Sequence, residues 1–235
     1  MNIKPFDAVG DYPSILNKVA TFTFFWSLIL VAIVRSRVPR IDQLLSIYTL
    51  QIPLMSNFNI PLGTIFPALL IAIVGRIIKL HDRISDIFKI RQRFDVNAIL
   101  FPLALITSPK LFPSQIAKIS EKRTELMSKV FYKYASSTPG KAVIDSHYIT
   151  LALDQWSWYW VILEGTLLST ITALLLLFYG DALYASRLLI IVLIMAIVIL
   201  PIIIDYCFKY ALNEVEQICA DENRKDEIAK VFHAL

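Results

Sequence analysis

Long apolar stretches alternate with charged segments along this chain. Four of the stretches approach the roughly 20 helical residues that are needed to cross a bilayer core. They comprise residues 19–34, 61–78, 157–178 and 188–204. A secretory signal is the alternative interpretation of the first stretch, but Arg35 follows it directly and no small-residue cleavage site is present. The pattern predicts an all-α membrane protein with about four transmembrane helices, the last two forming an antiparallel hairpin.

The segment between the first two stretches, residues 43–60, is uncharged but polar. Its serine, asparagine, glutamine and proline residues make it a poor lipid-facing helix, and exposed irregular backbone is not tolerated in hydrocarbon. We expect an interfacial or re-entrant segment that packs against protein. The alternative is a fifth span, which would move Arg35, Arg37 and Arg40 to the opposite side of the membrane.

Two further segments are predicted to be helical and amphipathic. Residues 79–156 include a helix that starts near Pro113 and an apolar stretch, residues 96–107, that is too short to span a bilayer. We expect that stretch to lie among lipid headgroups or to pack under the helix bundle. Residues 206–235 form an amphipathic C-terminal helix. The predicted organisation is therefore 1–78, 79–156, 157–205 and 206–235.

The charge distribution predicts which segments lie on the cytoplasmic side of the membrane. Hydrophobic residues make up 57% of the chain and charged residues only 18%, against about 25% charged residues in soluble domains. Residues 76–141 hold thirteen Lys and Arg but five Asp and Glu, a net charge of +8. Basic segments favour the cytoplasmic side. We therefore expect a multi-pass protein of the cell (inner or plasma) membrane with residues 79–156 and the C-terminus in the cytoplasm.

The same basic segment predicts the partners of the protein. Basic helices beside a membrane contact anionic lipid headgroups, and they also bind acidic proteins. No nucleic-acid-binding motif is present, so nucleic acid is not expected as a partner. The candidate residues for binding lipid or a cytosolic protein are Arg83, Arg91, Arg93, Lys118, Lys122 and Arg123.

One acidic residue, Glu164, lies about eight residues inside the third stretch. A carboxylate at that depth is costly unless it is paired, protonated or hydrated. Arg76, near the end of the second stretch, is at a compatible depth and is the expected partner. The functional hypothesis is a pore-lining or proton-sensitive group, and the alternative is a hydrogen-bonded residue near the membrane interface. Asp205 closes the fourth stretch and is a further candidate for a polar residue within the membrane, although a residue that simply marks the end of the span is the favoured interpretation.

Small residues repeat every four positions on two of the predicted spans. Such a seam allows two helices to approach closely, either within one chain or between copies of it. The seam residues are Gly165, Ser169 and Ala173 on the third span, and Ala68 and Ala72 on the second.

Motifs for catalysis or for cofactors are not found. His81, Asp82 and Asp86 do not share one helical face, so no metal site is expected. The chain contains no phosphate-binding loop, dinucleotide fingerprint or hydrolase motif. We therefore expect no cofactor and no enzyme activity. A weak cluster of Arg91, Arg93, Asp95 and Asn97 leaves an interfacial lipid-modifying enzyme as the least favoured alternative.

The order of the elements resembles that of MotA/ExbB-type proton-channel subunits, in which two spans, a cytosolic helical block and a two-span hairpin follow one another. It is also similar to small multi-span effectors of bacterial antiviral systems. These likenesses imply a homo-oligomeric pore or membrane-perturbing effector that is gated through its cytosolic helices. The alternative is a membrane anchor or adaptor that recruits a cytosolic partner through residues 76–141.

Overall fold

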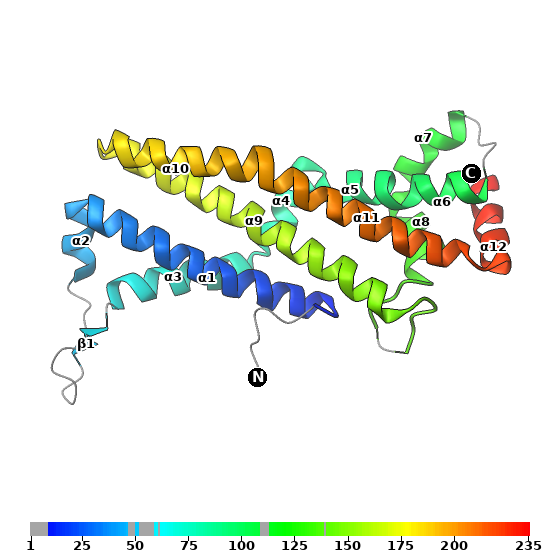
Figure 1. Ribbon diagram of the computed structural model, residues 1–235, viewed down its shortest axis with the longest axis horizontal. Coiled ribbons are helices and arrows are strands. Elements are labelled where there is room, and N and C mark those ends of the chain that lie inside the picture. Colours follow the sequence, from blue (N-terminus) through cyan, green and yellow to red (C-terminus); the bar gives the residue numbers. More distant parts are fainter. Residues whose placement is uncertain (1–8, 47–49, 52–58, 61, 109–112, 139) are drawn as a thin grey trace. The chain divides into compact units, whose positions relative to one another are not determined.

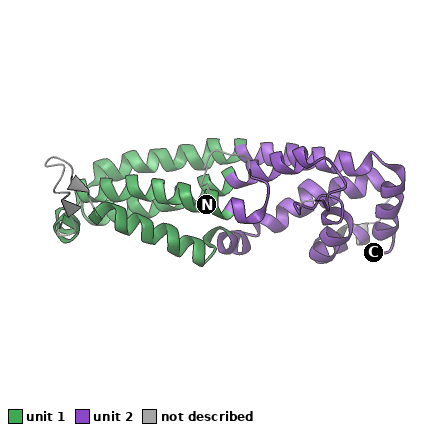
Figure 2. Cartoon of the chain, turned by 90° about the horizontal axis from the view of Figure 1, so that it is seen from below, with its two compact units in different colours: residues 1–6, 16–81, 158–202 green, residues 7–15, 82–157, 203–235 purple. Residues whose placement is uncertain are grey.

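A computed structural model describes residues 9–46, 50–51, 59–60, 62–108, 113–138 and 140–235. The described residues are almost entirely helical, which confirms the predicted all-α fold (Figure 1). The chain divides into two compact units, and several long helices contribute residues to both (Figure 2). Unit 1 comprises residues 1–6, 16–81 and 158–202, and unit 2 comprises residues 7–15, 82–157 and 203–235.

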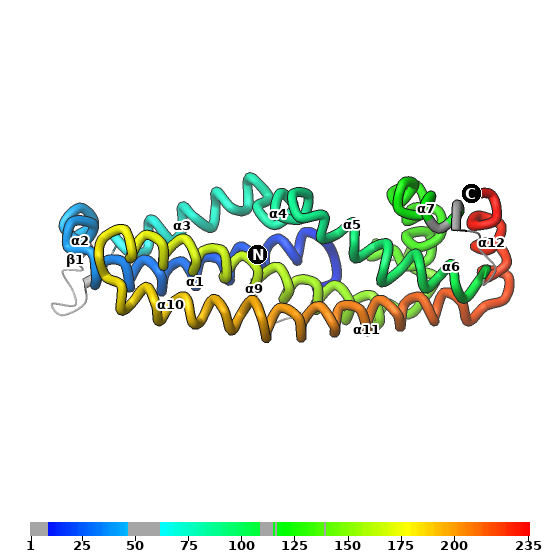
Figure 3. The backbone as a smooth tube through the Cα atoms, turned by 90° about the horizontal axis from the view of Figure 1, so that it is seen from above, coloured from blue at the N-terminus to red at the C-terminus, as the bar shows by residue number. Residues whose placement is uncertain are grey.

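Unit 1 is a bundle of apolar helices, which can be followed along the chain in Figure 3. Leu30, Ala173 and Leu188 form one cluster in its interior, and Val38, Leu176 and Ala185 form another. Helices α1, α9 and α11 extend beyond the unit. The elements of unit 1 are α1 (Tyr12–Arg37), α2 (Pro39–Ser46), β1 (Leu50–Gln51), β2 (Asn59–Ile60), α3 (Leu62–Ile77), α9 (Ser146–Phe178), α10 (Ala182–Ile194), η3 (Met195–Ile199) and α11 (Leu200–Cys219).

The outer surface of unit 1 is rich in exposed apolar side chains. Phe66 and Ile77 of α3, Leu174 of α9 and Ile197 of η3 are each more than half exposed. Exposed apolar surface of this extent marks contact with lipid or protein. Among the described residues three helices are long and apolar enough to cross a membrane, and α3 with α4 (Leu80–Phe88) makes a fourth when the bent pair is taken as one span. The predicted count of about four is therefore consistent with the structure.

The first spanning helix begins earlier than predicted, at Tyr12 instead of residue 19. A reciprocal cap explains the difference. The backbone N–H of Ser14 donates to Oδ1 of Asp11 at 2.8 Å, and the backbone N–H of Asp11 donates to Oγ of Ser14 at 3.1 Å. These bonds satisfy N–H groups that a helix start leaves without partners. The polar turns before residue 19 are thus part of the same helix.

The second pair of spans is also longer than predicted. Helix α9 begins at Ser146, eleven residues before the expected start, and α10 begins at Ala182 instead of residue 188. The turn between them contains Gly180, which has a φ of +86°, and Asp181, whose carboxylate accepts from the backbone N–H of Tyr184. A left-handed glycine ends the first helix and an aspartate caps the second, so the link is short.

A π-helical turn, η3, connects α10 to α11 just before Pro201. Proline has no N–H to donate to the carbonyl four residues earlier, and such a gap favours a local change of helix type.

The polar segment 43–60 lies largely outside the described residues. The parts that are described do not form a spanning helix, because Leu50 pairs with Ile60 and Gln51 with Asn59 in an antiparallel ladder. The pairing brings both ends of the segment together, whereas a spanning helix would separate them. This geometry disfavours the five-span alternative.

Arg35 and Arg37 would lie on opposite sides of the membrane in the four-span and five-span alternatives. Both have structural contacts within unit 1. Arg35 donates from Nε to Asp42 at 2.9 Å and from Nη1 to Oγ1 of Thr64 at 2.7 Å. The guanidinium of Arg37 lies 3.3 Å from the ring centroid of Tyr184. Arginine suits such bidentate and stacked sites. These contacts join the ends of α1, α2, α3 and α10, which gives Arg35 and Arg37 a role independent of membrane orientation.

Unit 2 has a conventional hydrophobic core. The apolar stretch 96–107 forms much of it, with Leu100 and Leu103 fully buried, and so is packed inside protein. Phe232, near the C-terminus, is buried in the same core. Besides α4 and parts of α9 and α11, the elements of unit 2 are α5 (Ile90–Phe94), η1 (Asp95–Leu100), α6 (Phe101–Thr107), α7 (Pro113–Glu121), α8 (Arg123–Leu126), η2 (Met127–Tyr132) and α12 (Glu222–His233).

Candidate functional site

Glu164 is buried in the interior of unit 1, with 2% of its surface exposed. The helical periodicity of α9 places it on the face that packs against other helices, since Trp160, one turn earlier, is also fully buried. A buried carboxylate is destabilising unless it is hydrogen-bonded, paired or protonated. The partners of Glu164 therefore define its chemistry.

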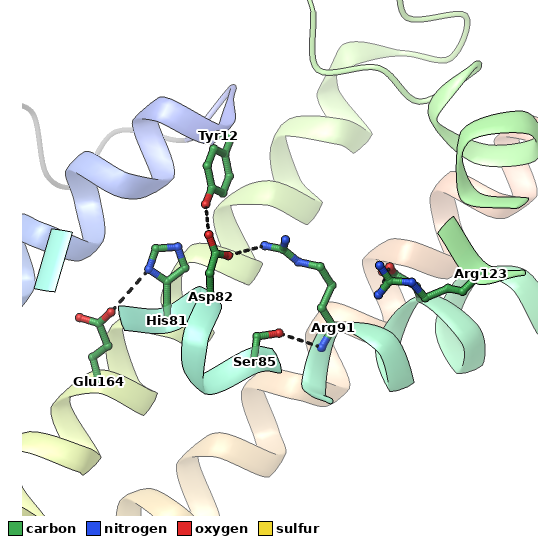
Figure 4. Close-up of polar contacts among 8 residues, drawn as sticks. Tyr12, His81, Asp82, Ser85, Arg91, Arg123 and Glu164 are labelled. Carbon is green, nitrogen blue, oxygen red and sulfur yellow. Dashed lines mark hydrogen bonds and ion pairs between the residues drawn. The ribbon is translucent and has the colours of Figure 1, made fainter. Parts of the chain in front are cut away.

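Two side chains from other helices contact the Glu164 carboxylate. Thr23 of α1 donates from Oγ1 to Oε2 at 2.7 Å. The ring of His81, on the first turn of α4, places Nδ1 3.6 Å from Oε1, and Figure 4 shows the imidazole directed at the carboxylate (Figure 4). His81 is itself only 2% exposed. An imidazole and a carboxylate thus form a buried pair in the apolar unit.

A small cavity adjoins the pair. It provides about 10 Å³ for the centre of a water molecule, and its lining includes Thr23, His81, Glu164, Ala72 and Gly75. Such a volume is close to the minimum that one water molecule requires. The ring centroid of His81 also lies 5.7 Å from that of Trp160. The pair therefore has an indole and room for about one water molecule among its neighbours.

The expected partner of Glu164, Arg76, occupies a different position. Arg76 lines the same cavity, but its side chain is exposed. The contacts that the structure gives to the carboxylate come from Thr23 and His81. Arg76 therefore lies where the cavity approaches the surface of unit 1. Asp205, on α11, is exposed and belongs to unit 2.

The small-residue seam is occupied within the chain. Trp26 of α1 donates from Nε1 to Oγ of Ser169 at 2.9 Å. An added Cβ at Gly165 would lie 3.3 Å from Cε2 of the same indole. Ala173 is fully buried beside Leu30. Ala68 and Ala72 of α3 are likewise buried. The seam therefore serves packing inside one chain.

Two of the predicted basic residues belong to a polar network in unit 2. Arg91 donates from Nη2 to Oδ1 of Asp82 at 3.1 Å, and the Tyr12 hydroxyl donates to Oδ2 of the same carboxylate at 2.6 Å (Figure 4). Arg123 places Nη1 3.3 Å from Oδ2 of Asp95, which is 5% exposed. Burial raises the pKa of Asp95 to about 6, against the opposing effect of the two arginines.

The other predicted basic residues are more exposed. The Lys118 ammonium donates to the C-terminal Leu235, so this lysine ties α7 to the end of the chain. The remaining three, Arg83, Arg93 and Lys122, are exposed. Arg91, Arg123 and Lys118 thus have contacts within unit 2, and the predicted basic residues differ in how far they are exposed.

Sequence analysis missed His81 and Thr23 as partners of Glu164. His81 was considered only with Asp82 and Asp86 as a metal site, and across the described part of the chain no group of three potential ligands could hold a metal ion. The sequence gives one indication of this pairing, because His81 lies close to the second apolar stretch and Glu164 lies within the third. Its orientation, however, depends on the bend of 55° between α3 and α4.

The fold and this site define a helical membrane protein with a buried carboxylate–imidazole pair. The chain belongs to the YmfE protein family, whose sequence model matches residues 11–233. No curated protein and no solved structure shows significant similarity to it.

Proposed function

We propose that this protein forms a channel-like homo-oligomer in the cell membrane and that protonation of the His81–Glu164 pair controls its permeability. The observation that carries the proposal is the burial of both groups beside a cavity of about one water. In the proposed orientation, residues 79–156 and the C-terminus lie in the cytoplasm, as the basic segment favours. The protein acts without catalysis in this account.

The chemistry of the pair explains how it would respond to protons. With one shared proton, the pair is either a charged imidazolium–carboxylate or a neutral imidazole–carboxylic acid, and both states have no net charge. Adding a proton leaves a buried positive charge, and removing one leaves a buried negative charge. An uncompensated buried charge destabilises a fold by about 3–5 kcal/mol. Hydration of the site relieves that penalty, so a change of charge favours an opened bundle.

Two further features support a response of this kind. The peptide bond between His81 and Asp82 joins unit 1 to unit 2, and the pair is thus covalently linked to the helices proposed to gate it. A cavity of about 10 Å³ is too small for a hydrated ion, so a wider pathway would require several copies of the chain.

The hypothesis of a membrane anchor or adaptor is less favoured, because several basic residues already have contacts within unit 2. Arg91, Lys118 and Arg123 contact Asp82, Leu235 and Asp95 within unit 2. These contacts already use part of the charge that a cytosolic partner would need, so the basic segment has fewer unengaged cations than its sequence suggests.

The test is proton permeability in liposomes that contain the purified protein and a trapped pH-sensitive dye. We expect wild-type permeability to change at least about tenfold between about pH 5 and pH 8, the range over which histidine changes charge. Glu164→Gln and His81→Gln should each abolish this pH dependence. The matched control is Glu216→Gln, at an exposed carboxylate of α11, which should behave like wild type. Liposomes that stay impermeable at every pH and protein density contradict the proposal.

A further inference from the structure

Unit 2 contains a polar pocket that the proposed function does not use. Its volume is about 370 Å³, and three basic residues line it: Lys89, Arg91 and Arg123. The hydroxyl groups of Ser120 and Thr124, both exposed, lie on the same lining. Three cations and two hydroxyl donors around one space are the groups that bind oxyanions.

Carboxylates outside the pocket lining hold the two guanidinium groups. Asp82 accepts from Arg91 and is itself fixed by the Tyr12 hydroxyl. The backbone N–H of Arg91 also donates to Oγ of Ser85 at 3.1 Å, and this bond holds the backbone at the start of α5. Asp95 forms an ion pair with Arg123, in which Oδ2 lies 3.3 Å from Nη1. Anchored arginines lose little side-chain entropy when a ligand binds.

Both arginines keep part of their surface accessible. The side chain of Arg91 is 39% exposed and that of Arg123 is 24% exposed. A guanidinium has five N–H donors in a planar fork that matches the oxygens of a phosphate. Both arginines also line the pocket, so their partly exposed side chains border the space that a ligand would occupy.

Two acidic residues limit the charge of the ligand. Asp86 and Glu121 are exposed on the same pocket, and with three cations the charged lining residues sum to +1. This small net charge is closer to the charge of a group with one or two negative charges than to that of a polyanion.

We propose that the pocket formed by Lys89, Arg91 and Arg123 binds a single phosphate group. A phospholipid headgroup and a small soluble phosphate compound share this chemistry. The site is independent of the His81–Glu164 pair, and it distinguishes two of the predicted basic residues, Arg91 and Arg123, from Arg93, Lys118 and Lys122, which are not part of its lining.

The experiment is calorimetric titration of inorganic phosphate into the full chain, held in nanodiscs of a neutral galactolipid, which carries no phosphate. We expect saturable binding that Arg91→Gln, Arg123→Gln and Lys89→Gln each weaken about tenfold or more, because each removes a charge-assisted hydrogen bond. Lys89→Gln breaks neither ion pair, and it tests the site even if an arginine variant misfolds. The matched control is Arg93→Gln, at an exposed arginine outside the pocket, which should bind as wild type does.

A second set of nanodiscs, containing phosphatidylglycerol, identifies the source of the phosphate. If an anionic headgroup occupies the pocket, inorganic phosphate binds only in discs without that lipid. If the ligand is soluble, phosphate binds equally in both. Absence of phosphate binding in both kinds of disc overturns the proposal, as does an equal loss in Arg93→Gln.

Discussion

Nδ1 of His81 lies 3.6 Å from Oε1 of Glu164, and each side chain is 3% exposed. The two residues come from different helices and are 83 positions apart in the chain. Neither group has access to bulk water, and Thr23 also donates to the Glu164 carboxylate. The two ionisable side chains therefore form one buried cluster, on which the proposed function rests.

The first prediction concerns the contribution of Glu164 to stability. Glu164→Leu removes the acceptor for Thr23 and the carboxylate beside His81, and should lower the free energy of unfolding by about 1–3 kcal/mol. Glu164→Gln keeps an oxygen that accepts from Thr23, so its loss should be smaller. Thermal unfolding in detergent micelles measures both. Asp205→Asn, at an exposed carboxylate, is the control and should change stability by less than about 0.5 kcal/mol. Equal losses in the leucine and glutamine variants would show that the Thr23 bond contributes nothing.

The second prediction concerns Asp95 and pH. Burial raises the pKa of Asp95 to about 6 in the folded protein, from 3.8. The folded state then binds the proton more tightly than the unfolded state, so ionisation destabilises the fold. This penalty is absent below about pH 4 and complete above about pH 6, where it amounts to roughly 3 kcal/mol at most.

Asp95→Asn should therefore flatten the decrease in stability that the wild type shows as pH rises from about 4 to 6. The measurement is the unfolding temperature of both proteins over that range. Asp226→Asn, at an exposed aspartate of α12, should keep the wild-type slope. An unchanged slope in Asp95→Asn would mean that this carboxylate has an ordinary pKa.

The third prediction concerns the helix seam. Gly165→Leu places a side chain against the Trp26 indole, whose Cε2 is already 3.3 Å from the position of an added Cβ. Overpacking of this kind costs about 1–3 kcal/mol. At Gly75 an added Cβ meets no atom within 4 Å, so Gly75→Ala should instead stabilise α3 by about 0.5–1 kcal/mol. Thermal unfolding distinguishes the two. A tolerated leucine at position 165 would contradict the described packing of α1 on α9.

The fourth prediction concerns the contacts of Arg35. Arg35→Gln removes the bond to Asp42 and the bond to Thr64, and should reduce stability by about 1.5–3 kcal/mol, as expected for hydrogen bonds to a charged group. Arg40→Gln, at a neighbouring exposed arginine, is the matched control. If membrane orientation alone explains these arginines, both variants should have the same stability as wild type, and only their topology should change.

Much of the fold follows from the sequence because its signals are local. A bilayer requires long apolar helices, and runs such as residues 188–204 have that character in isolation. Helix ends were harder to predict. The polar turns before residues 19 and 157 are helical because Asp11 and Asp145 cap them, and the hydrophobic pattern carries no information about those turns.

The candidate site was predicted only in part. Glu164 was identifiable because a charge within an apolar run is costly. Its partners were not, because the position of His81 depends on a break between α3 and α4, where Lys79 has a φ of +49°. A straight helix would have directed the imidazole elsewhere. The apolar stretch 96–107 was ambiguous for a related reason, since hydrophobicity alone does not separate a protein core from a membrane surface.

The most direct test of the central claim is infrared difference spectroscopy of the reconstituted protein between low and high pH. We predict a pH-dependent carboxylic-acid C=O band that is absent in Glu164→Gln and altered in His81→Gln. The same band should remain in Glu216→Gln. A spectrum in which Glu164→Gln is indistinguishable from wild type would show that this carboxyl group does not exchange protons, and would contradict the account.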